Sequence, residues 1–219
     1  MKSTVIFDMD GIIFDTERLY LEAWKIVASQ YKLDRIEEVV LACTGTNSDT
    51  TLKIVKSYFG EDFPYEFYRD EVRIHLNAAI AKNGIPQKPG VIPLLSFLKE
   101  SGCKIGLASS TRFEVVISEL KDAALDSYFD QIIGGDMVEK SKPDPEIFLT
   151  CAEKLDAIPE NTYVIEDSYN GIRALSRAGM LPVMVPDMIA PDEEMKDLAE
   201  FIFDDLLEVL KWIQTSRDI

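Results

Sequence analysis

The sequence predicts an α/β protein whose core is a doubly wound parallel sheet, with a small all-helical unit inserted into it. Short apolar runs alternate with helix-like segments, and one long N-terminal stretch has helical patterns but no convincing strand. Apolar runs without polar alternation are typical of strands buried on both faces, as in a parallel sheet covered by helices. The expected strands are residues 4–7, 104–108, 131–134 and 163–165, with 183–185 as a candidate for a fifth.

Polar or glycine-rich residues follow each of these runs. In an open, Rossmann-like sheet of this kind, ligands bind beyond the carboxyl ends of the strands. The residues that carry the function are therefore expected directly after the apolar runs.

The predicted helical insert begins near Thr16. Leu19, Ala23 and Val27 follow a helical spacing, and the stretch ends at the breakers Gly84-Ile85-Pro86 and Lys88-Pro89-Gly90. A helical unit of this size can bury a small core of its own and move as a cap. The expected domains are a catalytic core of residues 1–15 and 88–219 and a helical cap of residues 16–87.

The composition of the chain argues against some classes of binding partner. The chain has 219 residues, 47% of them hydrophobic, and a formal net charge of −16. Such acidity disfavours nucleic acid and anionic membrane surfaces, which attract Lys and Arg. The chain has three cysteines, no CxxC pair and no apolar run near the roughly 18 residues of a membrane span. We therefore expect a monomeric cytoplasmic protein with reduced thiols, no nucleic-acid partner and no membrane partner.

The first candidate site follows the first expected strand. Asp8 and Asp10 are two residues apart, so an extended chain points both carboxylates to one side. Neighbouring carboxylates repel, and one tends to keep its proton unless a cation lies beside them. This arrangement suits one ionised nucleophile and one proton donor, and Gly11 would let the backbone approach a phosphate with a free N–H. A solvated turn or an adventitious metal site is the structural alternative.

Two further segments offer groups for an anion. Ser109 and Ser110 follow the second expected strand and precede a helical pattern, where hydroxyl and N–H groups favour anions. Pro143 and Pro145 flank a turn that would hold Lys142 in place as a point charge for a phosphoryl group. An ordinary helix N-cap and a surface lysine are the alternatives.

The fourth candidate segment carries Glu166 and Asp167 at the end of an expected strand. Adjacent carboxylates of this kind suit Mg²⁺, which also binds substrate phosphate, although acids in the first turn of a helix are common without a metal. Each segment is weak evidence alone. Their joint placement after apolar strands indicates a single site for phosphoryl transfer.

These segments resemble a known family. The stretches DMDGIIFDTE, LASST, KPDPEIF and VIEDSYNGIRAL are similar, in order and spacing, to the four motifs of the haloacid dehalogenase-like superfamily. The branch that they resemble most is that of the β-phosphoglucomutases and related phosphatases, which carry a small helical cap after the first motif. The resemblance covers nearly the whole chain and implies a hydrolase that acts on a small phosphorylated metabolite.

The resemblance also implies a role for each motif residue. Asp8 would attack phosphorus and become a phosphoaspartate, and Asp10 would protonate the leaving oxygen and then activate the acceptor. Mg²⁺ would be held by the Asp8 carboxylate, the Asp10 carbonyl and Asp167, with Glu166 either a ligand or a partner of bound water. The phosphoryl oxygens would contact Gly11, Ser109, Ser110 and Lys142. Dehalogenases of the superfamily lack the second aspartate, so Asp10 favours phosphate chemistry.

The cap is expected to set the specificity through Tyr20 and the loop residues Gly45, Thr46 and Asn47. Tyr20 stands where β-phosphoglucomutases carry a histidine, and Asn47 where they carry an arginine. These departures favour hydrolysis of a sugar phosphate or similar monoester. A phosphomutase of the β-phosphoglucomutase type is the alternative reading, and a non-catalytic binding module on the same fold is a third.

Overall fold

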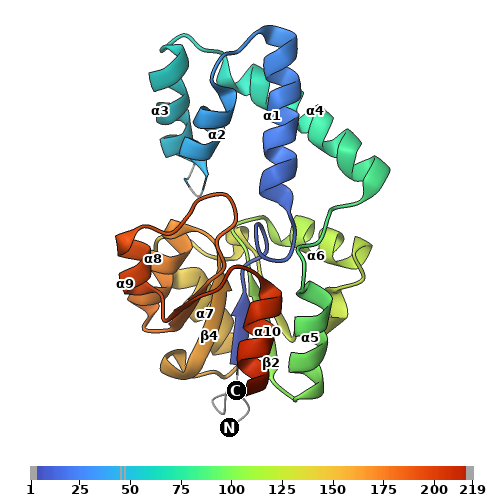
Figure 1. The fold of residues 1–219 in the computed structure, drawn as a ribbon, viewed down its shortest axis with the longest axis vertical. Helices are drawn as coiled ribbons and strands as arrows, with labels where there is room; N and C mark the ends of the chain where they lie inside the picture. The colour runs from blue at the N-terminus through green and yellow to red at the C-terminus, as the bar shows by residue number, and fades with distance from the viewer. Residues whose placement is uncertain (1–3, 45, 47, 216–219) are drawn as a thin grey trace. The chain divides into compact units, whose positions relative to one another are not determined.

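The computed structural model describes residues 4–44, 46 and 48–215. The chain divides into two compact units (Figure 1). The core unit contains the residues up to Phe14 and those from Gln87 onward, and the cap unit is Asp15–Pro86. The expected cap was residues 16–87, one residue later at each end.

The core unit is built on a six-stranded sheet in the order β3-β2-β1-β4-β5-β6. Every neighbouring pair of strands is parallel. The strands are β1 (Thr4–Phe7), β2 (Lys104–Ala108), β3 (Gln131–Ile133), β4 (Thr162–Glu166), β5 (Leu181–Met184) and β6 (Phe201–Ile202). The expected α/β fold with a parallel sheet is confirmed, and the candidate fifth strand is β5. The sixth strand was not expected, because two residues, Phe201–Ile202, are too few to show the hydrophobic pattern of a strand.

Helices cover both faces of the sheet, which explains why polar and apolar residues do not alternate along the strands. In β1 all four residues are buried. The helices α5 and α10 pack against each other, as do α7 and α8. The bounds are α5 (Val91–Glu100), α6 (Phe113–Asp122), α7 (Glu146–Lys154), α8 (Tyr169–Ala178), α9 (Glu193–Leu198) and α10 (Leu206–Thr215), with short 3₁₀ turns at Asp126–Tyr128, Gly135–Met137 and Pro159–Asn161.

The cap unit contains α1 (Thr16–Tyr31), α2 (Ile36–Cys43), α3 (Ser48–Phe59) and α4 (Tyr65–Asn83). Helix α1 packs against α2 and α4. The Trp24 ring stacks on Tyr65 at 6.4 Å between ring centroids, and the apolar residues Val27, Val40 and Val72 of the same unit are buried. The cap therefore has a hydrophobic core of its own.

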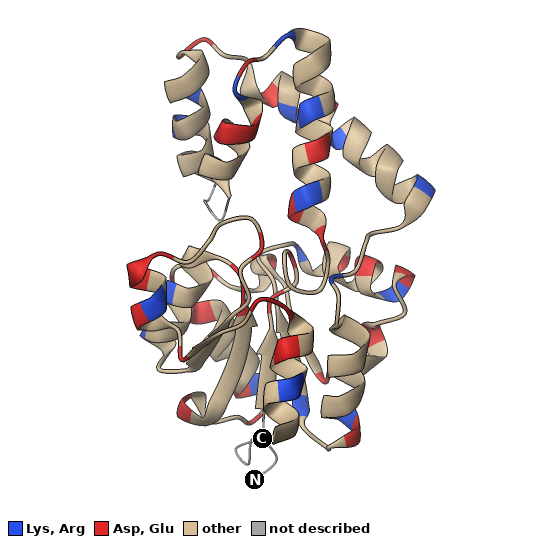
Figure 2. Ribbon diagram, viewed as in Figure 1, with Lys and Arg blue, Asp and Glu red and all other residues tan. Residues whose placement is uncertain are grey.

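The outer surfaces of both units carry mixed charge. Figure 2 shows acidic and basic residues side by side on the exposed helices. Many of them form pairs one helical turn apart, such as Lys25 with Glu22 at 3.2 Å and Arg35 with Glu38 at 2.7 Å. Such exposed pairs contribute little to stability, so the net charge is a surface property rather than a feature of the fold. Among the described residues, no helix is both long enough and apolar enough to cross a membrane.

Candidate active site

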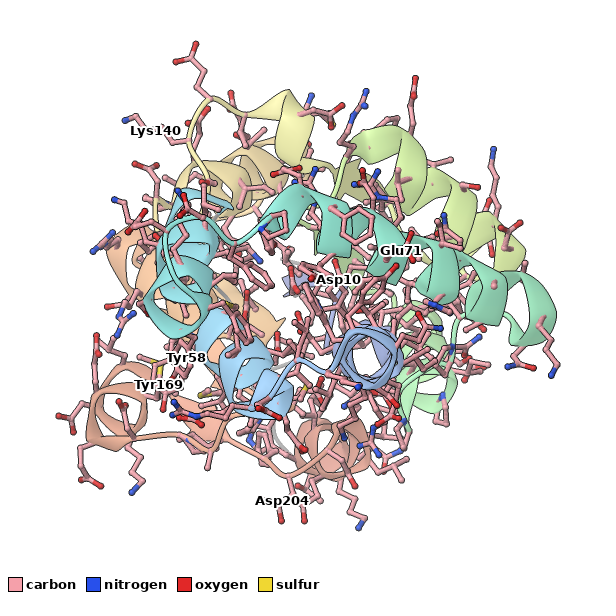
Figure 3. All side chains as sticks on the ribbon, turned by 90° about the horizontal axis from the view of Figure 1, so that it is seen from above. Asp10, Tyr58, Glu71, Lys140, Tyr169 and Asp204 are labelled. Carbon is pink, nitrogen blue, oxygen red and sulfur yellow. The ribbon has the colours of Figure 1, made fainter. Side chains whose placement is uncertain are left out.

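The sheet order brings the candidate residues together. Strand β1 lies between β2 and β4, so the residues that follow these three strands meet at one edge. Figure 3 looks onto the core unit from this edge. Asp10 lies near the middle of the view, whereas Lys140, Tyr169 and Asp204 of the same unit lie around it. The centre of the carboxyl edge is where a doubly wound sheet places its ligands.

Lys142 joins the ends of two strands. Its Nζ donates to Asp8 Oδ1 at 2.6 Å and to Glu166 Oε1 at 2.8 Å. The side chains of Lys142, Asp8 and Glu166 are 8%, 9% and 1% exposed. The Phe148 ring lies against the same ammonium, 4.6 Å from Nζ to the ring centroid. Lys142 is therefore a buried cation held by two carboxylates. The alternative of an ordinary surface lysine is excluded.

Burial and neighbouring charges shift the pKa values of this pair. Burial raises the pKa of Asp8 to about 7, with Lys142 acting in the opposite direction and the carboxylates of Glu166 and Asp10 adding to the rise. Burial lowers the pKa of Lys142, but Asp8 and Glu166 outweigh it and the net pKa lies above its ordinary value. The lysine thus remains charged, and it is the group that favours an ionised Asp8 inside the protein.

The loop that carries Lys142 is fixed from several sides. Arg177 Nη1 donates to the Pro143 carbonyl at 2.8 Å. The Glu146 carboxylate accepts the backbone N–H groups of Glu139 and Lys140 at 2.9 and 3.0 Å. These hydrogen bonds hold the lysine on its two carboxylate partners. The peptide bond between Lys142 and Pro143 is cis.

Three carboxylates at this edge could hold a metal ion. Oxygen atoms of Asp8, Glu166 and Asp167 lie within 4.8 Å of one another, and all three residues are buried. One lysine cannot neutralise three buried carboxylates. Such a cluster of carboxylate oxygens suits a hard divalent cation, such as Mg²⁺. Glu166 is also bound by Lys142 and by the N–H and hydroxyl of Ser168, so it is partly committed to protein donors.

Asp10 points its carboxylate to the other side of the site. Its Oδ2 accepts from Thr111 Oγ1 at 3.0 Å and from Ser109 Oγ at 3.4 Å. The Ser109 hydroxyl in turn accepts the Thr111 N–H at 3.0 Å. The carboxylate of Asp10 is therefore not in the metal cluster, and its main-chain carbonyl is the group that it could offer to a metal. Thr111 was missed by the sequence analysis, although it directly follows the two serines.

Gly11 has a different structural role from the one expected. Its N–H donates to the Phe14 carbonyl at 2.9 Å, so the expectation of a free N–H is wrong. This hydrogen bond closes the tight turn after β1. The φ of Gly11 is +80°, and a Cβ on Gly11 would lie 2.5 Å from Asp167 Oδ2. Glycine is needed here because the Asp167 carboxylate lies against the backbone of the turn. Ser110 of the second motif is exposed.

The cap residues are only partly described. Gly45 and Asn47 lie outside the described residues. Thr46 Oγ1 donates to the Cys43 carbonyl at 2.7 Å and shares a hydrogen bond of 2.8 Å with Thr51 Oγ1. Tyr20 packs edge-on against Trp24 at 6.3 Å between ring centroids. Both described residues are thus held within the cap, and their part in specificity stays a prediction.

Known proteins resemble the chain over most of its length. The sequence profile of the family described as haloacid dehalogenase-like hydrolase matches residues 5–185. The phosphorylated carbohydrates phosphatase of Thermotoga maritima is 35% identical over 176 residues, which are 80% of this chain and 81% of that protein. The β-phosphoglucomutase of Bacillus subtilis is 34% identical over 187 residues, 83% of this chain and 82% of that protein.

A solved structure agrees with the fold. The crystal structure of β-phosphoglucomutase from Clostridium difficile matches with a TM-score of 0.75 and 28% identity, covering 98% of this chain and 96% of that chain. The match extends through both units. The resemblance noted from the four motifs is confirmed, and the chain belongs to the haloacid dehalogenase-like hydrolase family, among its phosphatase-like and phosphomutase-like enzymes.

Proposed function

We propose that this enzyme is a Mg²⁺-dependent phosphatase that hydrolyses a small phosphorylated metabolite through a phosphoaspartate on Asp8. The observation that supports it best is the buried contact of 2.6 Å between Lys142 Nζ and Asp8 Oδ1, beside the acidic cluster with Glu166 and Asp167. A carboxylate in this setting is fixed in direction and shielded from bulk water, and Lys142 favours its ionised form against the effect of burial. These are the properties that a nucleophile for phosphorus requires.

Lys142 serves two purposes in this proposal. It favours the ionised form of Asp8 against the effect of burial, and it offers an ammonium to the negative oxygens of the transferring phosphoryl group. Catalysis of phosphoryl transfer consists mainly of positioning and charge neutralisation, because the transition state makes small covalent demands on the protein. Asp8, Asp167 and Glu166 are the side chains that would hold Mg²⁺, with the Asp10 carbonyl, and the ion would supply further charge neutralisation when bound.

Asp10 is the proposed acid and base. In the first half-reaction its carboxyl gives a proton to the leaving oxygen as Asp8 attacks phosphorus. In the second it takes a proton from the water that attacks the phosphoaspartate, so phosphate leaves and Asp8 is regenerated. The hydrogen bonds from Thr111 and Ser109 fix the direction of this carboxyl, which favours transfer at one defined position.

The substrate is proposed to be a sugar phosphate or a similar monoester. The Thermotoga maritima relative is named for phosphorylated carbohydrates, and the Bacillus subtilis relative for a phosphoglucomutase. Tyr20 places an aromatic ring pair with Trp24 where the mutase branch carries a histidine. This substitution favours water over a second sugar as the final acceptor. The cap, residues 16–87 in this proposal, selects the substrate.

The test is phosphate release from a panel of phosphorylated metabolites with Mg²⁺ or with EDTA. The unmodified enzyme should release phosphate only with Mg²⁺. Asp8→Asn keeps the size of the side chain and removes the nucleophile, so release should disappear. A mass gain of one phosphoryl group on the Asp8 peptide after rapid acid quenching, lost on treatment with hydroxylamine, would identify the intermediate as an acyl phosphate.

Two outcomes would change the proposal. Conversion of β-glucose 1-phosphate to glucose 6-phosphate with little free phosphate would favour a phosphomutase. Binding of Mg²⁺ and phosphate without turnover of any compound would favour the non-catalytic module. The buried Asp8–Lys142 pair argues against that module, because burying a charged pair is costly and a binding function has no need of it.

A further inference from the structure

A cavity of about 430 Å³ lies in the core unit at the amino ends of the strands. Lys104 begins β2 and Gln131 begins β3, and both line it. Strand β2 continues to Ala108 before the catalytic loop starts. At about 3.3 Å per residue, the strand separates the two ends by about 13 Å. The cavity is therefore not part of the phosphoryl-transfer site, and its volume falls within the range of about 300–1,000 Å³ that is usual for small-molecule sites.

Three lysines surround this cavity: Lys99 in the last turn of α5, Lys104, and Lys154 at the end of α7. Two aspartates, Asp130 and Asp156, also line it. Three cations against two anions leave a net positive lining in a chain of net charge −16. Helix C-termini favour lysines in their last turns, which explains Lys99 and Lys154 taken one at a time. This preference does not explain why all three lysines line the same cavity.

The contacts of the lysines leave much of this charge uncancelled. Lys99 Nζ donates to the Ser127 carbonyl and Lys104 Nζ to the Leu155 carbonyl. A carbonyl orients an ammonium but carries no net charge to neutralise it. Lys104 Nζ lies 3.9 Å from the Asp156 carboxylate, on a side chain that is 94% exposed. Among the described residues, Lys154 makes no ion pair within 4.0 Å.

The acidic side of the lining is also partly occupied. Asp130 Oδ2 accepts the Ile105 N–H at 2.8 Å, which ties this carboxylate to the backbone at the start of β2. Tyr128 supplies an aromatic wall. Its hydroxyl is held by Ser96 Oγ at 3.0 Å, and Lys99 Nζ lies 5.8 Å from its ring centroid. The cavity thus combines the ammonium groups of Lys99 and Lys104, each oriented by a carbonyl, with a fixed aromatic ring.

We propose that this lysine-lined cavity binds a small organic anion, with its phosphate or carboxylate groups on Lys99, Lys104 and Lys154 and its carbon skeleton against Tyr128. Lysine ammonium groups are point charges that can bind a phosphate or a carboxylate. The proposal is independent of the substrate of the catalytic edge. It assigns the core unit a second ligand site at the opposite end of the sheet.

Cys103 gives a reporter for this cavity because it lines the cavity and is half-buried. Burial raises the pKa of its thiol, so alkylation with N-ethylmaleimide is carried out at about pH 8.5. The full chain is labelled with and without citrate or inorganic phosphate, at constant ionic strength set with sodium chloride. Peptide mass spectrometry follows Cys103 and, as the internal control, Cys43 of the cap, which is likewise half-buried. The two anions distinguish carboxylate from phosphate recognition.

The expected result is a several-fold slower labelling of Cys103, with Cys43 unchanged, in citrate, in phosphate or in both. The variant Lys99→Gln/Lys154→Gln should lose this protection, and the exposed Lys121→Gln on α6 should keep it. As a second readout, the same anion should raise the unfolding temperature of the unmodified chain more than that of the double variant. Unchanged labelling and no differential rise in the unfolding temperature, or protection that survives in the double variant, would overturn the proposal.

Discussion

The Thr111 hydroxyl donates to the Asp10 carboxylate at 3.0 Å, across the loops that follow β2 and β1. The two residues are 101 positions apart in the chain. Thr111 also gives its N–H to Ser109, whose hydroxyl is the second donor to Asp10. The proposed acid and base is therefore oriented by a hydroxyl pair that arises from one short loop.

Replacing Thr111 with valine keeps the shape of the side chain and removes the donor. A hydrogen bond to a charged group contributes about 1.5 kcal/mol or more, so kcat should fall about tenfold with KM little changed. Thr111→Ser should restore the rate. Equal rates in all three proteins would show that the hydroxyl does not position Asp10.

Replacing Lys142 with methionine should strongly destabilise the metal-free protein. The change leaves Asp8 and Glu166 buried without their shared cation, and such a loss costs about 3–5 kcal/mol. Urea unfolding in EDTA measures it. The control is Lys140→Met, whose side chain is 69% exposed and lies 3.7 Å from Asp144, with an expected change of about 0.5 kcal/mol or less. Similar losses in the two variants would contradict the role assigned to the buried lysine.

Gly11→Ala and Gly60→Ala separate backbone strain from a clash at the metal cluster. Both glycines have positive φ, +80° and +97°, so each substitution should cost about 1 kcal/mol of stability. A Cβ at Gly11 would meet Asp167, whereas one at Gly60 meets nothing within 4 Å. Mg²⁺ should therefore raise the unfolding temperature of Gly60→Ala as in the unmodified protein, and much less in Gly11→Ala. An equal Mg²⁺ response would mean that Asp167 tolerates displacement.

Glu119 on α6 should make the stability depend on pH. Burial, and then the carboxylates of Asp10 and Asp122, raise its pKa from 4.5 to about 7. The folded protein then holds a proton that the unfolded chain has lost, so stability falls as the pH rises through this window and the loss is complete above 7. Glu119→Gln should thus stabilise the protein at pH values above 7, and progressively less toward 4.5.

Urea unfolding over this pH range, in EDTA, measures the difference between Glu119→Gln and the unmodified protein. Glu114→Gln is the matched control, because Glu114 is an exposed residue in the first turn of the same helix. Its difference from the unmodified protein should stay constant with pH. A constant difference for Glu119→Gln as well would mean that the folded state does not hold the extra proton.

Much of the fold and of the candidate site followed from local pattern. The apolar runs at β1 and β2 predict buried strands because residues covered on both faces have no polar alternation. The position of Asp8, Ser109 and Asp167 after such runs predicts that they meet, because parallel strands end at one edge of the sheet. The short strand Phe201–Ile202 could not be predicted in this way, since its pairing comes from β5 and not from its own residues.

By itself, the sequence determined which residues form the strands and which side chains follow them, because these depend on local hydrophobicity and turn chemistry. The tertiary structure decided the contacts among them. The sequence could not place Lys142 on Asp8, or Thr111 on Asp10, because those contacts span 134 and 101 residues and depend on strand order and loop path. It also could not show that the Gly11 N–H is used by Phe14, or that lysines from α5, β2 and α7 meet around one cavity. Distances between segments remote in the chain are set by packing, which no local pattern encodes.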